Sequence, residues 1–391
     1  MAEIARGLDG IVVTETRLSR VDGEAGELTI AGFPLEELAP NATFEEVLFL
    51  LWTDRLPSAK ELVALREQLA FRRRLPPASL ELLEMSAGLK IPPMDALRMA
   101  VDAIGTCEGE PHRPPDLPDV GCGIALTAPM PAIVAAYWRL LHGQEPVAPD
   151  PAIGHAANFL YMLEGKLPHA DKVRALETYL NTVVDHGMNA STFTARVIAS
   201  TRSDMLSAIV GGIGALKGPL HGGAPGPALD MVFEIRARAA RSGKPIAEEA
   251  EAWVRETVQA GGRIMGFGHR VYKVRDPRAD VLAQAAEKLF AGAGSASLYE
   301  EARTVEQVTL RVLEELKPGR NLKTNVEFYT ALVLHGIGLE AELFTPTFAI
   351  SRVGGWTAHV LEQIKEDRLI RPQSAYVGPT DRKWVPLDRR H

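Results

Sequence analysis

Cysteine is almost absent from this chain, which has only Cys107 and Cys122 among its 391 residues. Two thiols cannot build the disulfide framework of a small secreted domain, and so low a count suits a reducing compartment. The start of the sequence lacks the apolar stretch of a signal peptide. We also expect no apolar run long enough to span a membrane. Together these features predict a cytoplasmic protein with no membrane association.

An excess of positive charge is lacking as well. The chain has 43 Lys and Arg residues against 50 Asp and Glu residues, which gives a formal net charge of -7. A general nucleic-acid-binding surface needs the opposite balance. There is no His-Glu-x-x-His or Cys-x-x-Cys metal motif, no dinucleotide fingerprint after a strand and no Gly-x-Ser-x-Gly elbow. We therefore expect no nucleic-acid partner, no metal site and no redox cofactor.

Helical patterns dominate what is present. Thr43–Glu46 and Ser58–Glu61 both read as capping boxes before apolar residues at helical spacing. Further helices are expected over 131–142, 151–164, 171–186, 190–200 and 202–216. Strand alternation is weak and is best over roughly 10–18 and 27–31, which would form a small hairpin. The sequence thus predicts an all-α fold with a minor N-terminal β hairpin, and its length suggests two domains or one large domain with an inserted lobe.

The loop Gly266–Arg278 carries the most chemical information. It combines two glycines, His269 and several cations, and Asp276-Pro277 then reads as a helix N-cap with proline in the first turn. In an acidic protein, such a local basic cluster favours a specific anionic ligand, either a carboxylate or a phosphate. The alternative interpretation is a basic surface loop that precedes a helix. The segment Glu108–Asp119, by contrast, is rich in proline and reads only as an irregular surface loop.

Two more histidines stand in unusual settings. His221 lies beside two glycines at a predicted helix end, and His186 lies among small polar residues between two predicted helices. Turns positioned by a rigid scaffold often carry function, although each histidine alone could be structural. The spacing of His186, His221 and His269 contains no local metal-ligand pair.

Three arginines require partners. Arg278 closes the glycine-rich loop, and Arg352 and Arg371 lie in largely apolar sequence. A buried guanidinium must find an anion, and three of them suit a dicarboxylate or tricarboxylate because each can hold a carboxylate with two hydrogen bonds. Buried ion pairs, or side chains whose charged ends reach solvent, are the alternative.

Taken together and in order, these segments make the chain resemble the citrate synthase family, which includes 2-methylcitrate synthase. The resemblance covers almost the whole chain. It rests on Gly7–Ile11, Asp22–Gly26, Ala156–Met162, Asn189–Phe193, Gly218–Ala224, Gly266–Arg278, Asn325–Tyr329, Leu343–Pro346 and Arg371-Pro372.

The resemblance implies a helical two-domain fold and a homodimer. The large domain would comprise 1–222 and 338–391, form the dimer and hold oxaloacetate. The small domain would be an insertion over 223–337, would be mobile and would face the acyl-CoA. It implies that the enzyme needs no cofactor and uses acetyl-CoA as a substrate.

The resemblance also implies catalytic roles. His221 would hydrogen-bond the thioester carbonyl and stabilise the enol, His269 would polarise the ketone of oxaloacetate, and Glu327 would be the base. Lys273 would contact the phosphates of coenzyme A, assisted by Arg275.

The remaining implied residues would bind oxaloacetate. His186 would contact it beside His269, and Arg278, Arg352 and Arg371 would hold its carboxylates. Arg371 would reach across from the partner subunit.

Glu327 departs from the family pattern, which has aspartate at this position. The extra methylene moves the carboxylate by roughly one carbon–carbon bond, and a misplacement of about 1 Å can cost about 100-fold in rate. Either the backbone accommodates the longer base, or the chain is a weakly catalytic paralogue that binds metabolites or serves in assembly. Gly187 and Ala224–Gly226 are smaller departures. An acyl pocket separates one methylene by only about 1–3 kcal/mol, so propionyl-CoA and 2-methylcitrate remain an alternative to acetyl-CoA and citrate.

Overall fold

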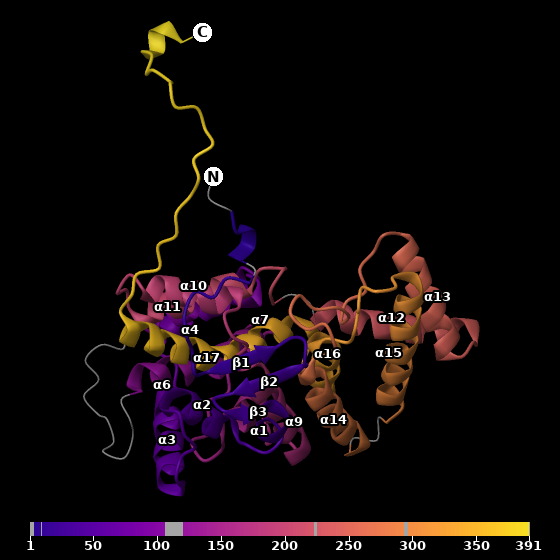
Figure 1. Ribbon diagram of the computed structural model, residues 1–391. Helices are drawn as coiled ribbons and strands as arrows, with labels where there is room; N and C mark the ends of the chain where they lie inside the picture. Colours follow the sequence, from indigo (N-terminus) through magenta and orange to yellow (C-terminus); the bar gives the residue numbers. More distant parts are fainter. Residues whose placement is uncertain (1–3, 9, 106–119, 223–224, 293–295, 391) are drawn as a thin grey trace.

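The computed structural model describes residues 4–8, 10–105, 120–222, 225–292 and 296–390. It confirms the all-α fold class, with one small sheet near the N-terminus (Figure 1). Cys107, the predicted loop over 108–119 and the predicted domain start at 223 lie outside the described residues.

The sheet is antiparallel and has the order β1 (Ser19–Asp22), β2 (Glu27–Ile30) and β3 (Phe33–Pro34). The predicted second strand is confirmed, but the first was placed too early, over 10–18. The turn that pairs Asp22 with Glu27 fixes the register, so the partner strand begins at Ser19. The preceding residues bind the C-terminal helix instead, where the Thr16 hydroxyl donates to Glu362 at 2.8 Å.

Most helices form one large body around a buried central helix. Both predicted capping boxes are present, with Thr43 and Ser58 as N-caps. The helices of the body are α1 (Leu35–Leu38), α2 (Phe44–Thr53), α3 (Ala59–Arg72), α4 (Pro77–Gly88), α5 (Pro93–Asp102), α6 (Gly121–Thr127), α7 (Met130–Leu141), α8 (His155–Glu164), α9 (Ala170–Val183), α10 (Ala190–Ala199), α11 (Met205–Leu216) and α17 (Phe344–Glu366). Helix α17 packs against α2, α6, α7, α9, α10 and α11, and its Trp356 is fully buried.

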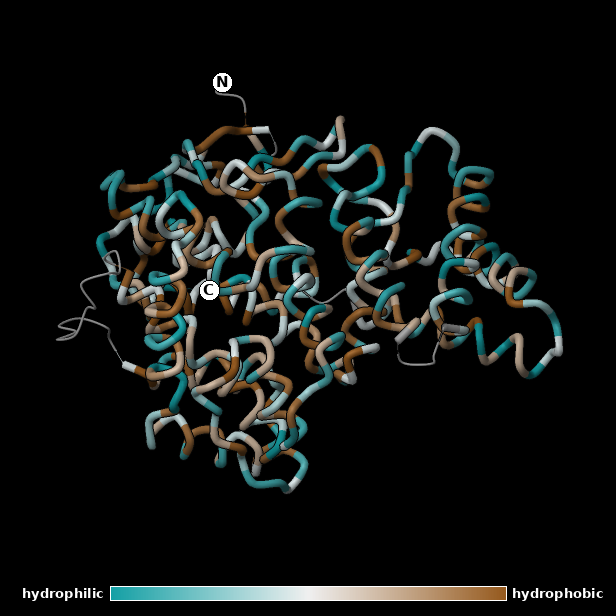
Figure 2. Tube along the Cα trace, turned by 90° about the horizontal axis from the view of Figure 1, so that it is seen from below, coloured by the Kyte–Doolittle hydropathy of each residue, from teal (hydrophilic) through white to brown (hydrophobic). Residues whose placement is uncertain are grey.

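The remaining helices form a lobe on one side of this body. They are α12 (Pro225–Ser242), α13 (Ile246–Gln259), α14 (Pro277–Gly292), α15 (Ala296–Leu316) and α16 (Val326–Gly336). Figure 1 shows α12, α13 and α15 far from the sheet, with α14 and α16 between them and the body. Helices α14 and α16 pack on α9, which joins the lobe to the body. In Figure 2, apolar and hydrophilic residues alternate along the helices of both parts, as expected for amphipathic helices.

The expectation that no apolar run reaches membrane-spanning length was wrong. The segment Gly121–Leu141 is long and apolar enough by length and composition. In the fold it forms the two helices α6 and α7, and 78% of its most apolar window is buried inside the protein. A helix buried in a protein core can be as long and as apolar as a membrane-spanning helix.

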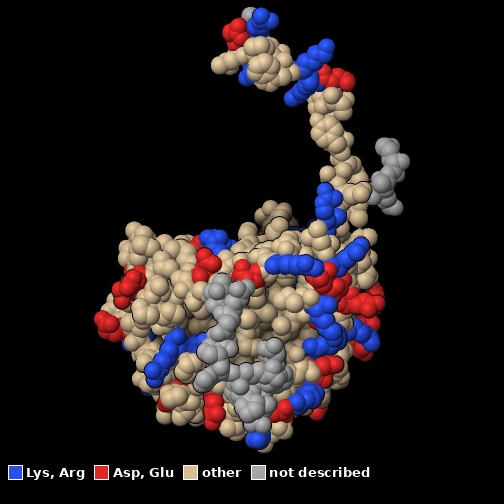
Figure 3. Space-filling view, turned by 90° about the vertical axis from the view of Figure 1, so that its left-hand side faces the viewer, with Lys and Arg blue, Asp and Glu red and all other residues tan. Residues whose placement is uncertain are grey.

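The C-terminal tail leaves the body after α17 ends at Glu366, with Asp367 as its C-cap. Figures 1 and 3 show it standing away from the helices. It exposes large apolar side chains, including Val377 at 94% and Trp384 at 79%.

Candidate active site

Two chain segments are joined along a short backbone seam in the lobe. The N–H of Gly268 donates to the carbonyl of Lys323 at 2.7 Å, and the N–H of Asn325 donates to the carbonyl of Gly266 at 2.9 Å. Both glycines have φ of +85°, which side chains rarely adopt. The seam therefore holds the glycine-rich loop against the start of α16.

His269 projects from this loop as a neutral hydrogen-bond donor. Its Nδ1 accepts the backbone N–H groups of Val271 at 3.0 Å and Tyr272 at 3.2 Å. The ring proton is then on Nε2; the Arg278 guanidinium 3.3 Å away is also a donor, so the two groups do not hydrogen-bond each other. Burial and the Arg278 charge lower the pKa of His269 to about 4. At neutral pH its Nε2–H can therefore polarise a carbonyl oxygen.

Arg278 is oriented by a carboxylate of the same loop. Its Nε and Nη2 bind the two oxygens of Asp276 at 3.0 and 2.8 Å, and only 5% of the Arg278 side chain is exposed. The N–H of Val326 donates to the same carboxylate at 3.2 Å. Asp276 thus fixes the arginine to the seam, a role that its position as a predicted helix cap did not reveal.

Glu327 lies in the first turn of α16, after its N-cap residue Asn325. Its backbone N–H donates to the Asn325 side chain at 3.0 Å. Burial raises the pKa of the Glu327 carboxyl to about 7, against the opposing charge of Arg278. A carboxylate with this pKa is a suitable general base near neutral pH.

His221 is also neutral, but it presents the other ring nitrogen. Its Nε2 accepts the backbone N–H of Ser191 at 3.3 Å and lies 2.8 Å from the Ser191 hydroxyl. That hydroxyl oxygen also accepts the indole N–H of Trp356 at 3.0 Å. Burial and the charge of Arg352 lower the pKa of His221 to about 4. The Ser191 hydroxyl also donates to the side-chain oxygen of Asn189 at 2.8 Å, so it does not decide the tautomer of His221. The backbone N–H of Ser191 can only donate, so we assign the accepting role to Nε2 and the ring proton to Nδ1.

Arg352 supplies a second buried cation from α17. It is 1% exposed, and its Nε donates to the carbonyl of Val183 at 2.8 Å. The guanidinium carbon lies 4.7 Å from the ring centroid of Phe348. Burial lowers the pKa of Arg352 to about 10, so it stays charged at neutral pH. The rest of the guanidinium fork is available to a carboxylate.

His186 completes the cluster. Its ring centroid lies 5.8 Å from that of His269, and its Nε2 lies 3.1 Å from the hydroxyl of Tyr272. Burial, followed by the charges of Arg278 and Arg352, holds the pKa of His186 well below its usual value. The structure therefore brings His186 and His269 together beside Arg278.

Three of the substrate-binding residues expected from the sequence do not lie in the cluster of His186, His269 and Arg278 within one chain. Arg371 is exposed on the tail, which points away from the body. Lys273 is exposed on the loop. Arg275 already binds Asp280 and Glu306, so a phosphate would have to displace carboxylates from it.

Sequence reasoning missed several residues that position the site. Ser191 lies in a segment that was recognised, but its contact with His221 arises only when α10 packs near the glycine turn. Tyr272 and Asp276 lie within the recognised loop, and only their spacing from His269 and Arg278 could have suggested a role. Across the described ranges, no group of three or more His, Cys, Asp or Glu side chains could hold a metal ion.

Residues of these types can hold a polycarboxylate on their cations and can remove a proton from a carbon beside a carbonyl. Enzymes that form carbon–carbon bonds through an enol require both of these abilities. Known proteins agree with this class. The family model described as citrate synthase, C-terminal domain, matches residues 7–373. The citrate synthase of Haloferax volcanii is 40% identical over 392 residues, which cover 99% of each chain.

Two further relatives extend the comparison. The 2-methylcitrate synthase of Mycobacterium tuberculosis is 37% identical over 388 residues, covering 97% of this chain and 92% of that one. A solved citrate synthase from Thermoplasma acidophilum, in ternary complex with carboxymethyl coenzyme A and oxaloacetate, is 31% identical, has a TM-score of 0.86 and is covered completely. The chain belongs to the citrate synthase family. It is an enzyme of the type that transfers an acyl group.

Proposed function

We propose that this enzyme condenses acetyl-CoA with oxaloacetate and hydrolyses the resulting citryl-CoA to citrate and coenzyme A. The observation that carries the proposal is the presence in this chain of two buried neutral histidines, His221 and His269, and of a buried carboxyl with a raised pKa, Glu327. Family membership supports the reaction, and we assign the roles of these three residues from their chemistry.

The first step is enol formation. Glu327 removes a proton from the methyl carbon of acetyl-CoA, and its pKa of about 7 suits this task. The Nδ1–H of His221 donates to the thioester oxygen as negative charge develops there. Because His221 is neutral, it stabilises the enol without first losing a proton.

The second step joins the two substrates. The enol carbon attacks the ketone carbon of oxaloacetate, and the ketone oxygen takes the proton from Nε2 of His269. The proton that Glu327 removed from the methyl group then restores His269, so both residues regain their starting protonation. Arg278 and Arg352 hold the carboxylates of oxaloacetate, with His186 beside them. Water then cleaves the thioester of citryl-CoA. Each step needs only acid–base and hydrogen-bonding groups. We therefore infer that no cofactor takes part and that acetyl-CoA enters the reaction as a substrate.

Coenzyme A would enter from the lobe side. Lys273 is exposed on the loop and is available to a phosphate. Arg275 would assist only after release from Asp280 and Glu306. Movement of a small domain over 223–337 against the body of 1–222 and 338–391 would supply that rearrangement and exclude water from the thioester.

We further infer a cytoplasmic homodimer in which Arg371 of one subunit completes the oxaloacetate site of the other. The exposed apolar tail supports this assembly, since a second copy would cover it.

Propionyl-CoA is the second candidate donor because a 2-methylcitrate synthase aligns over nearly the whole chain. The test is coenzyme A release with oxaloacetate plus acetyl-CoA, and then plus propionyl-CoA. We expect release with acetyl-CoA at the higher kcat/KM. A higher kcat/KM with propionyl-CoA would reassign the donor, and no release with either would leave only the metabolite-binding or assembly role.

Subunit complementation tests the shared site. Arg371→Ala and Glu327→Gln would be co-expressed, each being nearly inactive alone. If Arg371 acts across the interface, each mixed dimer regains one intact site, and random pairing gives about one quarter of wild-type activity. Activity no higher than that of the single variants would show that Arg371 does not act across the interface.

A further inference from the structure

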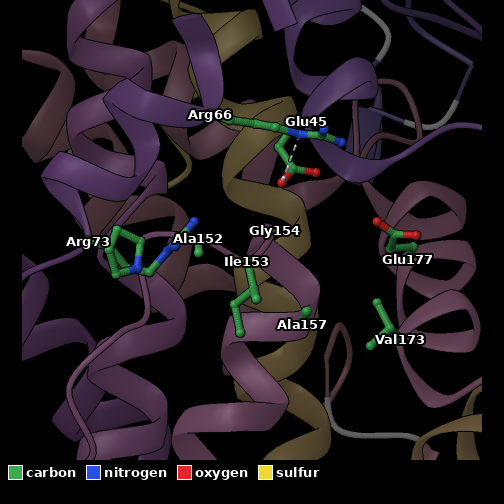
Figure 4. A pocket seen from close by; sticks show the side chains of 10 residues that line it. Glu45, Arg66, Arg73, Ala152, Ile153, Gly154, Ala157, Val173 and Glu177 are labelled. Atoms are coloured by element: carbon green, nitrogen blue, oxygen red, sulfur yellow. Dashed lines mark ion pairs between the residues drawn. The ribbon is translucent and has the colours of Figure 1, made fainter. Parts of the chain in front are cut away.

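A second polar cavity shares no residue with the histidine site (Figure 4). It has a volume of about 240 Å³ and lies among α2, the end of α3, the start of α8 and α9. Its charged lining side chains are Glu45, Arg66, Arg73 and Glu177. The reaction proposed above uses none of them.

Arg73 is a buried cation on which the charge of Glu45 acts from nearby, without a hydrogen bond between the two side chains. It follows the last residue of α3 and is 2% exposed, and its Nε and Nη1 have no hydrogen-bond partner. No ion pair to it is found among the described residues. Burial lowers the pKa of Arg73 only to about 10, so the guanidinium is charged at neutral pH. A buried guanidinium with two donors that lack acceptors favours an anionic group such as a carboxylate beside it.

Acceptors line the other side of the cavity. Glu45 is 1% exposed; its Oε1 accepts the N–H of His155 at 2.8 Å, and its Oε2 has no partner. Arg66 approaches the same carboxylate only to 3.9 Å and is 44% exposed. Glu177 stands on α9, and burial raises its pKa to about 7. In Figure 4, Arg73 and Glu177 lie on opposite sides of the cavity, with Glu45 between them.

This distribution of charge discriminates among ligands. A dicarboxylate would satisfy Arg73 but would be repelled by Glu45 and Glu177. An inorganic anion would leave the free oxygen of Glu45 without a donor. An amine alone would leave Arg73 unpaired. A zwitterion satisfies both sides at once.

We propose that the cavity binds a free α-amino acid, with its carboxylate on Arg73 and its ammonium group between Glu45 and Glu177. The rest of the wall is apolar, with Ile153 and Val173 facing the space that a side chain would fill. The ligand is therefore an amino acid with an apolar side chain that fits a volume of about 240 Å³.

The first test measures binding to the full-length wild-type enzyme. Each standard amino acid is screened by thermal shift, and hits are titrated by calorimetry with oxaloacetate at saturation. We expect one or more apolar amino acids to bind with unchanged affinity when oxaloacetate fills the histidine site. The matched carboxylic acid without the amine, and the matched amine without the acid, should each bind at least about tenfold more weakly. No binding by any amino acid, or equal binding by the deaminated acid, overturns the proposal.

Variants then locate the ligand. Arg73→Met replaces an unpaired buried charge with an apolar group of similar length, so folding and coenzyme A release should be retained while amino-acid binding is lost. Arg74→Met, at the exposed neighbouring position, is the matched control and should bind normally. Glu177→Gln should weaken binding about tenfold and decides the question if Arg73→Met does not fold. Wild-type affinity in Arg73→Met or Glu177→Gln contradicts the assignment.

Discussion

His221 and His269, the two histidines proposed to be catalytic, present opposite ring nitrogens for different structural reasons. His269 is fixed by the backbone N–H groups of Val271 and Tyr272, which belong to its own loop. His221 is fixed by Ser191, which belongs to a different helix and is itself bonded to Trp356. The conformation of its own loop therefore determines which ring nitrogen of His269, in the lobe, can donate. Packing between distant segments determines which ring nitrogen of His221, in the body, can donate.

Burial has the same effect on the pKa of both histidines. Burial beside an arginine lowers the pKa of each histidine to about 4, while burial raises the pKa of Glu327 to about 7. Two imidazoles that would be partly charged in water near neutral pH become fully neutral donors, and the carboxyl becomes a stronger base. The comparison teaches that burial shifts acids and bases in opposite directions.

Glu327→Gln should give the largest effect because it removes the base and leaves both donors in place. We expect kcat to fall about 100- to 10,000-fold, the usual contribution of a general base. The measurement is coenzyme A release at saturating substrates. Oxaloacetate affinity, measured by calorimetry as a control, should stay close to wild type. Near-normal turnover would remove Glu327 from the mechanism. Glu327→Asp should retain activity, since it keeps a carboxylate.

Arg352→Gln should weaken the binding of oxaloacetate. Loss of a charge-assisted hydrogen bond is worth about 1.5–3 kcal/mol, so the oxaloacetate Kd should rise about 10- to 150-fold. Calorimetry measures this change. Arg98→Gln, on the exposed side of α5, is the control and should bind normally. An unchanged Kd for Arg352→Gln would show that this arginine does not hold the substrate.

The pH profile should report Glu327 and neither histidine. The base acts when deprotonated, so kcat/KM should fall about tenfold per pH unit below a pKa of about 7 and be level above it. The histidines, with pKa values of about 4, stay neutral throughout. The profile is measured from about pH 5 to about pH 9. A rate that is level down to about pH 5 would contradict the raised pKa.

Ser191→Ala should give the smallest effect and tests how packing fixes His221. The backbone N–H of residue 191 remains, but the hydroxyl is lost, so kcat should fall about 2- to 10-fold, as expected for one hydrogen bond. Ser86→Ala is the matched buried serine, whose hydroxyl donates to Leu82 in α4, and should keep wild-type kcat. Wild-type kcat in Ser191→Ala would show that the hydroxyl does not orient His221.

The parts of the site that depend on local sequence could be predicted. The capping boxes at Thr43 and Ser58, the loop with His269 and the cap at Asp276 all follow from residues a few positions apart. The first strand was misplaced because residues before Ser19 bind Glu362 on α17, which is distant in sequence.

What could not be predicted depends on contacts between distant segments. The contact of His221 with Ser191 requires α10 to meet the glycine turn. The ion pairs that occupy Arg275 involve Glu306 on another helix. The unpaired charge of Arg73 in the second cavity likewise becomes visible only when α2, α3 and α9 are packed together. The positions of these residues along the sequence do not reveal that they are in contact.

The central claim is that two neutral histidines donate from opposite nitrogens, and nitrogen-15 NMR of histidine-labelled enzyme tests it most directly. His221→Asn and His269→Asn assign the two signals. Between about pH 6 and 8, the structure predicts that neither ring titrates, with the proton on Nδ1 of His221 and on Nε2 of His269. Titration of either ring in this range, or the same tautomer in both, would contradict it.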